Sequence, residues 1–521
     1  MSKPKRVGLR TALACALAVV AAGWAFAAEP LSIGWSEMDI TPPFTKRVPL
    51  AGQYYQRLAD PANPVHSRLK VVAVAMQQGG EAFIEAAIDN VTVWEPWTKR
   101  VRARVHERVP EIAPERLFIN CIHTHSAPRI RPAGTPAAAK MEREQPDVWG
   151  PNEYADFALE RVAEACVAAW KARQPGRVRR AFGAARIGHC RLALYADGSS
   201  EMYGDTRRSD FVQMLEGEDD GVGMLFTVDA RGRTTGVIAN VACPSQVMES
   251  THQISSDFAG AARERLKKAF GEDFRMLYQI GAAGCQSPRD LVRRGRNGEH
   301  DGWHADTCAM LGERLATCIM EAEAGAVEMP SVLRHACVRL ELPRRRVTAA
   351  QVAEAKRVIA ALDEKTSEKE ERDRFLEVVR ANEAKDGPGP YDDKNMAYVT
   401  YQINKAIVAR GKDQDERPNL PIEMHVVRIG DVAFVSNPFE LYLAYGQSIK
   451  ARSAAKQTFI VEKCGSQGYV PTPAAENARG YGGGVNNGEI GHEGAYMYCD
   501  EAVSHIGRLF GASAAAAARA P

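Results

Sequence analysis

The stretch Phe118-Ile-Asn-Cys-Ile-His-Thr-His-Ser-Ala-Pro128 is an apolar, strand-like run that ends in two histidines one residue apart. In an extended backbone, residues i and i+2 point to the same side, so we expect His123 and His125 to face one cleft. Neutral imidazole is the commonest metal ligand in proteins and carries protons near neutral pH. Taken alone, the pair is more typical of strand-end histidines bonded to backbone carbonyls, because so short a motif often arises by chance. Residues elsewhere in the chain decide between the two interpretations.

Apolar runs of strand length alternate with helical patterns on both sides of this stretch. Leu69–Met76 and Ala82–Ile88 have the composition of strands, Trp97–Val109 has helical spacing, and Leu117–Ile122 is the next strand. This alternation predicts a mixed α/β fold with a layered sheet core and flanking helices. Further along, the same criteria predict a helix over Asn152–Ala172, a helix over Phe258–Lys268 capped by Asp257, and strands over Val237–Ala242, Met276–Ile280, Val426–Val435 and Phe459–Glu462.

The segment 346–421 departs from this pattern. Thr348 and Gln351 form a capping box, and apolar residues at helical spacing continue to about Glu383, which predicts an exposed helical hairpin. The Gly-Pro-rich break Asp386–Pro390 ends the hairpin, and a polar loop over 411–421 leads back to strand. The many charges favour a solvated insertion over a lid or a partner surface.

The N-terminus has the pattern of a secretory signal over residues 1–27. A basic segment precedes the apolar run Ala12–Val20, and Ala25-Phe-Ala27 offers small residues at the cleavage spacing. We therefore expect an exported protein, secreted or periplasmic, without a transmembrane segment after cleavage, since this run is too short to cross a bilayer. The cations that leave with the signal are Lys3, Lys5, Arg6 and Arg10.

The mature chain is expected to form one large domain over 28–511, followed by a frayed tail over 512–521. Loss of those four cations lowers the formal net charge from +2 to −2, so no basic surface for nucleic acid is expected. Of 11 cysteines, all but Cys15 remain, and export permits disulfides. Cys166, Cys308 and Cys318 fall in helical patterns and are expected to be small buried apolar residues.

Side chains suited to catalysis or metal binding follow five of the predicted strands. Ligand sites in open α/β sheets form beyond the carboxyl ends of strands, so we expect these side chains to meet in one cleft. They are His123 and His125 after Leu117–Ile122, Cys243 after Val237–Ala242, Ser287 after Met276–Ile280, Glu440 after Val432–Ser436 and Tyr469 after Phe459–Glu462.

The motifs around these residues also resemble a known family. In chain order they are Asp39-Ile-Thr-Pro-Pro43, His123-Thr-His-Ser-Ala-Pro128, Cys243-Pro-Ser with Ser255-Ser-Asp257, Gly284-Cys-Gln-Ser-Pro288, Asn437-Pro-Phe-Glu440 and Gly468-Tyr-Val-Pro-Thr472. This set spans about residues 32–510 and is similar to the N-terminal catalytic domain of the neutral/alkaline (non-lysosomal) ceramidase family. Each motif is short, but their order and spread make a chance match improbable.

The resemblance implies a zinc amidohydrolase that cleaves the amide bond of a small N-acyl or lipid-like substrate, ceramide being the family's own. Matched residue by residue, it also assigns catalytic roles to Ser287 as nucleophile or water-orienting hydroxyl, to His125 as oxyanion stabiliser or proton shuttle, and to Arg191 as holder of a polar substrate group. A zinc ion would polarise the carbonyl and lower the pKa of bound water. The implied zinc ligands are His123, Cys243, Glu440 and Tyr469.

Two positions depart from the family pattern. Cys243 stands where the family has a histidine, and Cys285 stands where it has an acidic residue two places before the serine. Cys243 is either a thiolate ligand, which zinc accepts, or half of a disulfide with Cys285, which would leave a metal weakly held. The alternative functions are therefore an esterase or other acyl hydrolase at the same site, and a catalytically silent binding protein.

Overall fold

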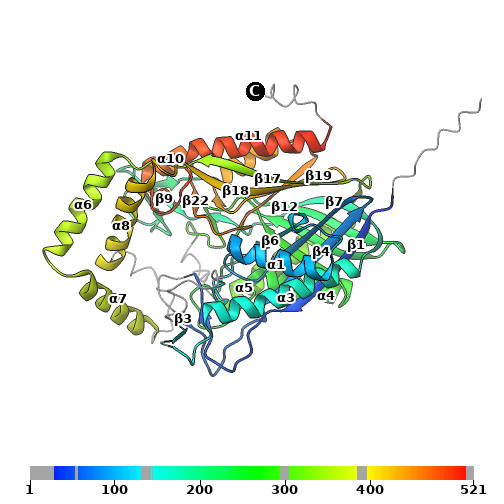
Figure 1. Cartoon of the computed structure of the whole chain (residues 1–521), viewed down its shortest axis with the longest axis horizontal. Helices are drawn as coiled ribbons and strands as arrows, with labels where there is room; N and C mark the ends of the chain where they lie inside the picture. Colours follow the sequence, from blue (N-terminus) through cyan, green and yellow to red (C-terminus); the bar gives the residue numbers. More distant parts are fainter. Residues whose placement is uncertain are drawn as a thin grey trace, which may run out of the picture.

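The computed structural model describes residues 29–52, 57–130, 142–143, 145–293, 304–383 and 396–511 (Figure 1). The predicted signal over 1–27, the break Asp386–Pro390 and the tail over 512–521 lie outside the described residues. In the parts that are described, strands and helices alternate as the sequence predicts, and the mixed α/β fold with a layered sheet core is confirmed.

The larger sheet has nine strands in the described residues, in the order β14-β13-β12-β7-β1-β4-β5-β6, with β16 also paired to β7. Most neighbours are antiparallel, but β5–β6 and β13–β14 are parallel pairs. The strands are β1 (Ser32–Asp39), β4 (Lys70–Gln78), β5 (Glu81–Ile88), β6 (Leu117–Cys121), β7 (Gln174–Ala184), β12 (Gly221–Asp229), β13 (Thr234–Val241), β14 (Arg275–Ile280) and β16 (Val327–Glu328).

A second sheet has the order β17-β18-β19-β21 and packs face to face on the larger one. Its strands are β17 (Leu333–Pro343), β18 (Asn419–Ile429), β19 (Val432–Ser436) and β21 (Gln457–Val461), of which β19 and β21 are parallel. Between the sheets lies a continuous apolar layer that includes Phe83, Phe118, Ile238, Phe434 and Phe459. Each such side chain contributes about 1.5–3 kcal/mol when fully buried, so this layer fixes how the two sheets sit on each other.

Helices cover the outer faces of both sheets (Figure 1). The outer face of the larger sheet packs against α1 (Glu95–Arg108), α3 (Pro151–Lys171), α4 (Asp257–Phe270) and α5 (Ala305–Glu323). The second sheet carries α9 (Leu443–Arg452) and α11 (His492–Leu509). Cys166, Cys308 and Cys318 are buried in α3 and α5, as predicted. The result is a helix, sheet, sheet, helix arrangement of layers.

The larger sheet is strongly curved, so strands that are far apart in its order meet. β14 contacts β4, β5 and β6, and the Asn120 side-chain amide donates to the Tyr278 carbonyl at 3.0 Å. Beyond the strand ends, the Ser245 N–H donates to the Ile122 carbonyl at 2.9 Å, and the Glu462 N–H donates to the Ile280 carbonyl at 3.0 Å. The carboxyl ends of the parallel pairs β5–β6, β13–β14 and β19–β21 are thereby brought to one place.

Short elements connect this frame and carry several of the predicted site residues. Two paired segments matter most, β8 with β15 and β20 with β22. The short elements are β2 (Pro49–Leu50), β3 (Arg57–Leu58), η1 (Pro114–Arg116), β8 (His189–Cys190), β9 (Leu192–Tyr195), β10 (Ser200–Met202), β11 (Phe211–Met214), β15 (Gln286–Ser287), β20 (Glu440–Leu441), β22 (Tyr469–Val470) and α10 (Pro473–Ala478).

Two predicted boundaries are wrong. The run Val426–Val435 is not one strand, because Gly430 adopts a φ of 58° and turns the chain from β18 into β19. The polar loop predicted over 411–421 is shorter, since α8 continues to Asp413 and β18 begins at Asn419. In Figure 1 the insertion extends away from the sheets as α6 (Ala349–Asp363), α7 (Glu368–Glu383) and α8 (Ala397–Asp413).

The capping box at the start of the insertion is confirmed. The Thr348 hydroxyl accepts the Gln351 N–H at 3.1 Å, and the Gln351 side chain accepts the Thr348 N–H at 2.9 Å. Among the helices that the structure describes, none combines the length and the apolar character needed to cross a membrane.

A buried carboxyl group in β5 predicts a pH-dependent stability. Burial raises the pKa of Glu85 from 4.5 to about 8, and its nearest polar partner is the neutral Gln279 amide at 2.8 Å. The folded state therefore binds this proton more tightly than the unfolded state, so stability falls as pH rises from about 4.5 to 8.

We expect Glu85→Gln to remove this fall. Urea unfolding at pH 5 and pH 8 should show a difference between the two proteins that grows with pH by up to about 4 kcal/mol, at about 1.4 kcal/mol per pKa unit. Glu81→Gln, at the half-exposed start of the same strand, is the control. Parallel pH profiles for wild type and Glu85→Gln would contradict the prediction.

Candidate functional site

His123 lies just beyond β6, and one of its ring nitrogens, Nδ1, is hydrogen-bonded to the backbone. Its backbone N–H donates to the Asn90 carbonyl at 3.0 Å, and Nδ1 donates to the Val91 carbonyl at 2.7 Å. The proton on Nδ1 leaves Nε2 with its lone pair. Burial lowers the pKa of His123 to about 3 despite the opposing charge of Glu440, so the ring is neutral.

His125 contacts a buried carboxylate that the sequence analysis did not identify. Its Nδ1 lies 2.9 Å from Oε2 of Glu249, an ion-pair contact rather than an aligned hydrogen bond. The other carboxylate oxygen of Glu249 lies 2.8 Å from Nη1 of Arg289, and both of these side chains are about 2% exposed. The rings of His123 and His125 meet edge to face with centroids 4.9 Å apart. The two rings are therefore neighbours, although His123 has a φ of 66° and is not in the extended backbone on which the prediction relied.

Tyr203 connects the His125 side of the site to Arg191. Its hydroxyl lies 3.2 Å from Nη1 of Arg289 and 3.3 Å from Nη1 of Arg191. The Gln246 side-chain amide donates to the same hydroxyl at 2.9 Å. Arg191 is further fixed by a 2.9 Å bond from Nη2 to the Gly284 carbonyl. A half-buried phenol thus links two guanidinium groups from separate loops.

Glu440 and Tyr469 are direct partners in the parallel pair β20–β22. Arg191 Nη2 lies 3.3 Å from the Tyr469 hydroxyl and 3.6 Å from Oε2 of Glu440. Lys463 Nζ lies 3.5 Å from Oε1 of Glu440. Burial alone would raise the pKa of Glu440, but the charge of Lys463, the neighbouring His123 and the charge of Arg191 lower it to about 2. The carboxylate is therefore ionised and held between two cations.

These side chains form one connected group, which we call the polar ring. It lies beyond the carboxyl ends of strands from both sheets, where ligand sites of α/β folds form. Its members are His123, His125, Glu249, Arg289, Tyr203, Arg191, Tyr469, Glu440 and Lys463. Five of the seven predicted site residues belong to it, namely His123, His125, Arg191, Glu440 and Tyr469.

Strained backbone is concentrated at the polar ring. Among the described residues, five non-glycine residues have a positive φ, and three of them, His123, Tyr203 and Lys463, are ring members with values of 66°, 60° and 57°. Such conformations cost of order 1–3 kcal/mol each and persist where the surrounding structure imposes them. The strain supports a functional role for the ring, because stability alone would select against it.

Asp257, a fourth residue of this kind, holds the loop that carries Glu249. Asp257 is the first residue of α4, with a φ of 56°, and not the residue before the helix as predicted. Its carboxylate still accepts an N–H at the helix start, that of Phe258 at 2.8 Å. It also accepts the Met248 N–H at 2.7 Å and the Ser245 hydroxyl at 3.4 Å, so it joins the helix start to this loop.

Cys243, a predicted zinc ligand, is a buried free thiol. Its Sγ lies 3.6 Å from the Ile187 carbonyl and 3.5 Å from the Pro244 carbonyl, so the S–H is directed at backbone oxygens. Burial, which disfavours the thiolate, raises its pKa well above 9. Cys285 is also free, and it belongs to the apolar cluster on the far side of the second sheet, whereas Cys243 belongs to the α4–α5 cluster. The alternative of a Cys243–Cys285 disulfide is not formed in this structure.

Ser287 lies beside the polar ring, and its hydroxyl contacts the backbone of a ring residue rather than a ring side chain. Its hydroxyl accepts the backbone N–H of Arg289 at 3.1 Å, and its strand β15 pairs with β8, two residues before Arg191. The predicted catalytic serine is thus fully buried and fixes the start of the segment that carries Arg289. Its role as a nucleophile stays a prediction.

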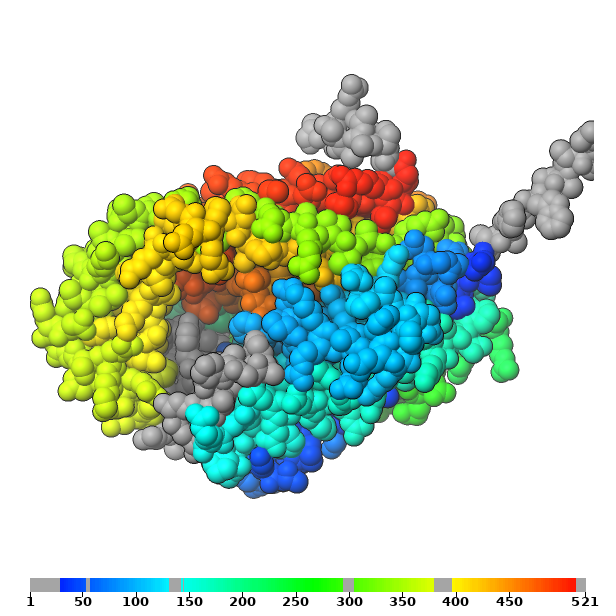
Figure 2. Space-filling model, in the orientation of Figure 1, coloured from blue at the N-terminus to red at the C-terminus, as the bar shows by residue number. Residues whose placement is uncertain are grey.

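A pocket of about 730 Å³ lies near the polar ring, and its lining includes Gly468, which precedes the ring residue Tyr469, but no ring residue itself. Its lining includes Trp94 before α1, Ala406 and Arg410 of α8, and Gln467 and Val485. Figure 2 shows a hollow on this face between the yellow α8 and the blue start of α1. Lys463 Nζ donates to the Gln467 carbonyl at 3.4 Å, so one residue contacts both ring and pocket wall. The helical insertion therefore borders the pocket.

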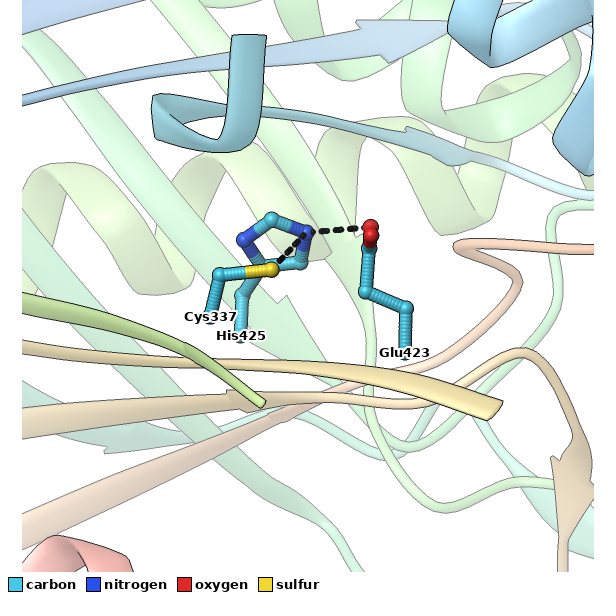
Figure 3. A group of neighbouring side chains, drawn as sticks. All are labelled: Cys337, Glu423 and His425. Atoms are coloured by element: carbon cyan, nitrogen blue, oxygen red, sulfur yellow. Dashed lines mark hydrogen bonds and ion pairs between the residues drawn. The ribbon is translucent and has the colours of Figure 1, made fainter. Parts of the chain in front are cut away.

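One group of potential metal ligands among the described residues lies away from the ring. Ligand atoms of Cys337, Glu423 and His425, on β17 and β18, are within 4.8 Å of one another (Figure 3). Arg102 of α1 already occupies this place, with guanidinium nitrogens 2.6 and 3.1 Å from the Glu423 carboxylate and 3.0 Å from Nε2 of His425. A metal ion would have to displace this cation, so the group is better described as a buried ion pair.

The predicted zinc ligands do not fit a zinc ion as they stand. His123 satisfies one requirement, because a metal-binding histidine usually donates its other N–H to a carbonyl or carboxylate. Cys243 does not, since its Sγ contacts the Ile187 and Pro244 carbonyls, and both oxygens of Glu440 face cations. Within the described residues, His123, Cys243 and Glu440 do not form a group of three converging ligand atoms.

Four ring residues were missed from the sequence. Tyr203, Glu249 and Arg289 lie in loops, and no spacing marks them as partners. Lys463 carried a signal that was not used, because it directly follows the predicted strand Phe459–Glu462. The rule that selected the other strand-end residues also applies to it.

The fold is similar to that of solved ceramidases. No protein-family model matches the chain, and no curated protein matches its sequence. Neutral ceramidase from Pseudomonas aeruginosa superposes with a TM-score of 0.63 at 18% identity, covering 93% of this chain and 75% of that one. A ceramidase complexed with C2 gives a TM-score of 0.63 at 16% identity, covering 93% and 76%. The chain therefore has a ceramidase-like fold.

Close approach of the backbone to His125 gives a test of the site geometry. Gly52 has a φ of +93°, and a Cβ there would lie 2.3 Å from Cγ and Nδ1 of the His125 ring. We expect Gly52→Ala to destabilise the protein by about 1–3 kcal/mol more than a glycine substitution that meets no neighbour. Gly232→Ala is that control, because Gly232 has a φ of +83° and open space around it. Equal losses in urea unfolding would contradict the contact.

Proposed function

We propose that the chain hydrolyses an acyl bond at the polar ring. The amide bond of a ceramide-like N-acyl compound is the first substrate class, and an ester or another acyl compound is the second. The observation that carries this proposal is the ring itself, which contains an imidazole beside a carboxylate, His125 with Glu249, and two cations beside Glu440. General base and oxyanion stabilisation are the two functions that acyl hydrolysis requires of an enzyme.

The chemistry can be written with this chain's own residues. His125, oriented by Glu249, takes a proton from water as the water oxygen bonds to the acyl carbon. The carbonyl oxygen becomes an oxyanion, which Arg191 and Lys463 stabilise by charge. When the C–N or C–O bond breaks, the proton on His125 passes to the leaving nitrogen or oxygen. Every step uses a group at the ring.

The nearby pocket supports a small-molecule substrate. Its volume of about 730 Å³ falls in the range of about 300–1,000 Å³ that is usual for ligand sites. Trp94 and Val485 offer apolar surface for an acyl chain, and Arg417 and Asn486 offer polar groups. The similar solved structures are ceramidases, which favours a lipid-like compound over other acyl substrates.

The resemblance predicts a zinc ion, but the predicted ligands do not converge in this structure. Hydrolysis by His125, Arg191 and Lys463 does not require zinc, and the metal content of the purified protein tests zinc binding separately.

A second candidate is a binding protein that uses the same ring without turnover. The contact that favours it is that of Ser287, whose hydroxyl accepts a backbone N–H rather than meeting His125. Such a protein would bind acyl compounds and release them unchanged.

Export through the signal over 1–27 is also a proposal. Expression of the full chain in a bacterial host, followed by N-terminal sequencing of the exported protein, should give a mature chain that starts after Ala27. Retention of Met1 in protein recovered from the cytoplasm would contradict it.

Removal of the imidazole gives the direct test of catalysis. We expect His125→Ala to lower kcat/KM on N-acyl and ester substrates by about 10²–10⁴-fold, because the general base is lost. Glu249→Gln should give a smaller loss, since the imidazole stays but loses its orienting charge. The matched control is His505→Ala, which removes another histidine paired with a glutamate, on α11. Unchanged turnover in His125→Ala would refute the assigned role.

A further inference from the structure

Both carboxylate oxygens of Glu440 face side-chain cations. Oε1 faces the Lys463 ammonium at 3.5 Å, and Oε2 faces the Arg191 guanidinium at 3.6 Å. The side chains of both cations are about 5% exposed or less. A carboxylate that coordinates zinc uses an oxygen at about 2.0–2.2 Å, and each Glu440 oxygen is already turned to a cation.

The backbone aims Lys463 into the ring. Lys463 follows β21 with a φ of 57°, a conformation that non-glycine residues adopt at a cost. The loop after it is anchored at two points, where the Cys464 N–H donates to the Asn437 carbonyl at 3.0 Å and the Thr92 hydroxyl donates to the Gly465 carbonyl at 2.9 Å. Lys463 therefore faces inward because its loop is fixed, which sets it apart from a surface lysine.

The charge of the ring also opposes a metal ion. Arg191, Arg289 and Lys463 are cations, and Glu249 and Glu440 are anions, so the ring has an excess of one positive charge. A zinc ion would raise this excess to three in a buried site, and uncompensated buried charge is strongly unfavourable. The Sγ of Cys243 lies 3.6 Å from the Ile187 carbonyl and 3.5 Å from the Pro244 carbonyl.

We propose that Lys463 provides the positive charge that zinc was predicted to provide, and that the site binds an acyl compound by its carbonyl or carboxylate oxygen at Lys463 and Arg191 without a metal ion. This inference deepens the proposed function and rests on it for the identity of the ligand. The protein would then belong to the metal-independent hydrolases in its chemistry while keeping a ceramidase-like fold.

The test is zinc content and zinc response, measured without reference to activity. Full-length protein is produced in zinc-supplemented medium, purified without chelator and analysed by elemental mass spectrometry. We expect wild type to contain only trace zinc and to show no shift in Tm when zinc is added. In Cys243→His/Lys463→Ala, which restores the family's ligand type and removes the cation, we expect near-stoichiometric zinc and a Tm that rises with added zinc.

Two further variants keep the result interpretable. Lys463→Ala alone should already raise zinc content above that of wild type, and it avoids placing a larger side chain at the buried Cys243. Lys450→Ala is the matched control, because Lys450, on α9, is a lysine paired with a carboxylate, that of Asp219, and does not belong to the ring. Stoichiometric zinc in wild type that is lost in His123→Ala would overturn the inference. So would trace zinc in every Lys463 variant, because Lys463 would then not be what excludes the metal.

Turnover separates this inference from the proposed function. Hydrolysis by zinc-free wild type that is unaffected by chelator supports both. Zinc-free wild type that hydrolyses none of the N-acyl or ester substrates keeps the inference and removes the proposed function. Hydrolysis that is abolished by chelator and restored by zinc keeps the proposed function and removes the inference.

Discussion

The apolar layer between the two sheets is the constraint on which the site depends. Phe118 of β6 lies in this layer together with Phe434 of β19 and Phe459 of β21. β6 packs across this layer against β19 and β21 of the other sheet. The residues beyond the ends of these strands are therefore brought together, and they include His123, Glu440 and Lys463. The position of the polar ring is therefore set by hydrophobic packing, and its polar contacts then select the orientation of each side chain.

The polar ring is expensive to fold, and its surroundings supply the compensation. Buried ions lose hydration free energy, and the attraction between paired charges offsets this loss only when all hydrogen-bond partners are in place. Each ring cation is accordingly met by more than one group, as with Arg191, which contacts Glu440, Tyr469, Tyr203 and the Gly284 carbonyl. Together with the strained backbone at three ring positions, this indicates a site held ready for a ligand rather than a core optimised for stability.

The frame was predictable from the sequence because its signals are local. Runs such as Ala82–Ile88 and Leu117–Ile122 are continuous, apolar and of strand length, and the structure has β5 and β6 there. The error over Val426–Val435 arose because its turn, at Gly430 and Asp431, interrupts the apolar pattern for only two residues. At Asp257 the local preference is kept, since its carboxylate accepts the Phe258 N–H at the helix start, but its contacts with the loop before Glu249 could not be predicted from local sequence.

The site was only partly predictable, because several of its residues lie in loops. The strand-end rule located His123, Glu440 and Tyr469, whose positions follow from the sheet. It could not locate Tyr203, Glu249 or Arg289, because these residues lie in loops and meet the site only through tertiary contacts. The question of Cys243 was open for a similar reason, since a thiol two residues beyond a strand end has the same spacing whether it coordinates a metal, forms a disulfide or contacts carbonyls.

Among the described residues, a single physical solution recurs at the group of potential metal ligands and at the predicted zinc ligands. At Cys337, Glu423 and His425, the cation between the ligand atoms is the guanidinium of Arg102. At His123 and Glu440, the cations are Lys463 and Arg191. A side-chain cation neutralises a buried carboxylate as a metal does, but it is covalently attached and carries one charge instead of two. If the proposed function and the metal-free site are correct, two consequences follow for catalysis. Such a site does not depend on metal supply, and it cannot acidify a bound water as strongly as zinc, so a base has to accept the proton from water. The buried pair of His125 and Glu249 is the group at the ring that can do this, and its presence is what a metal-independent site of this kind requires.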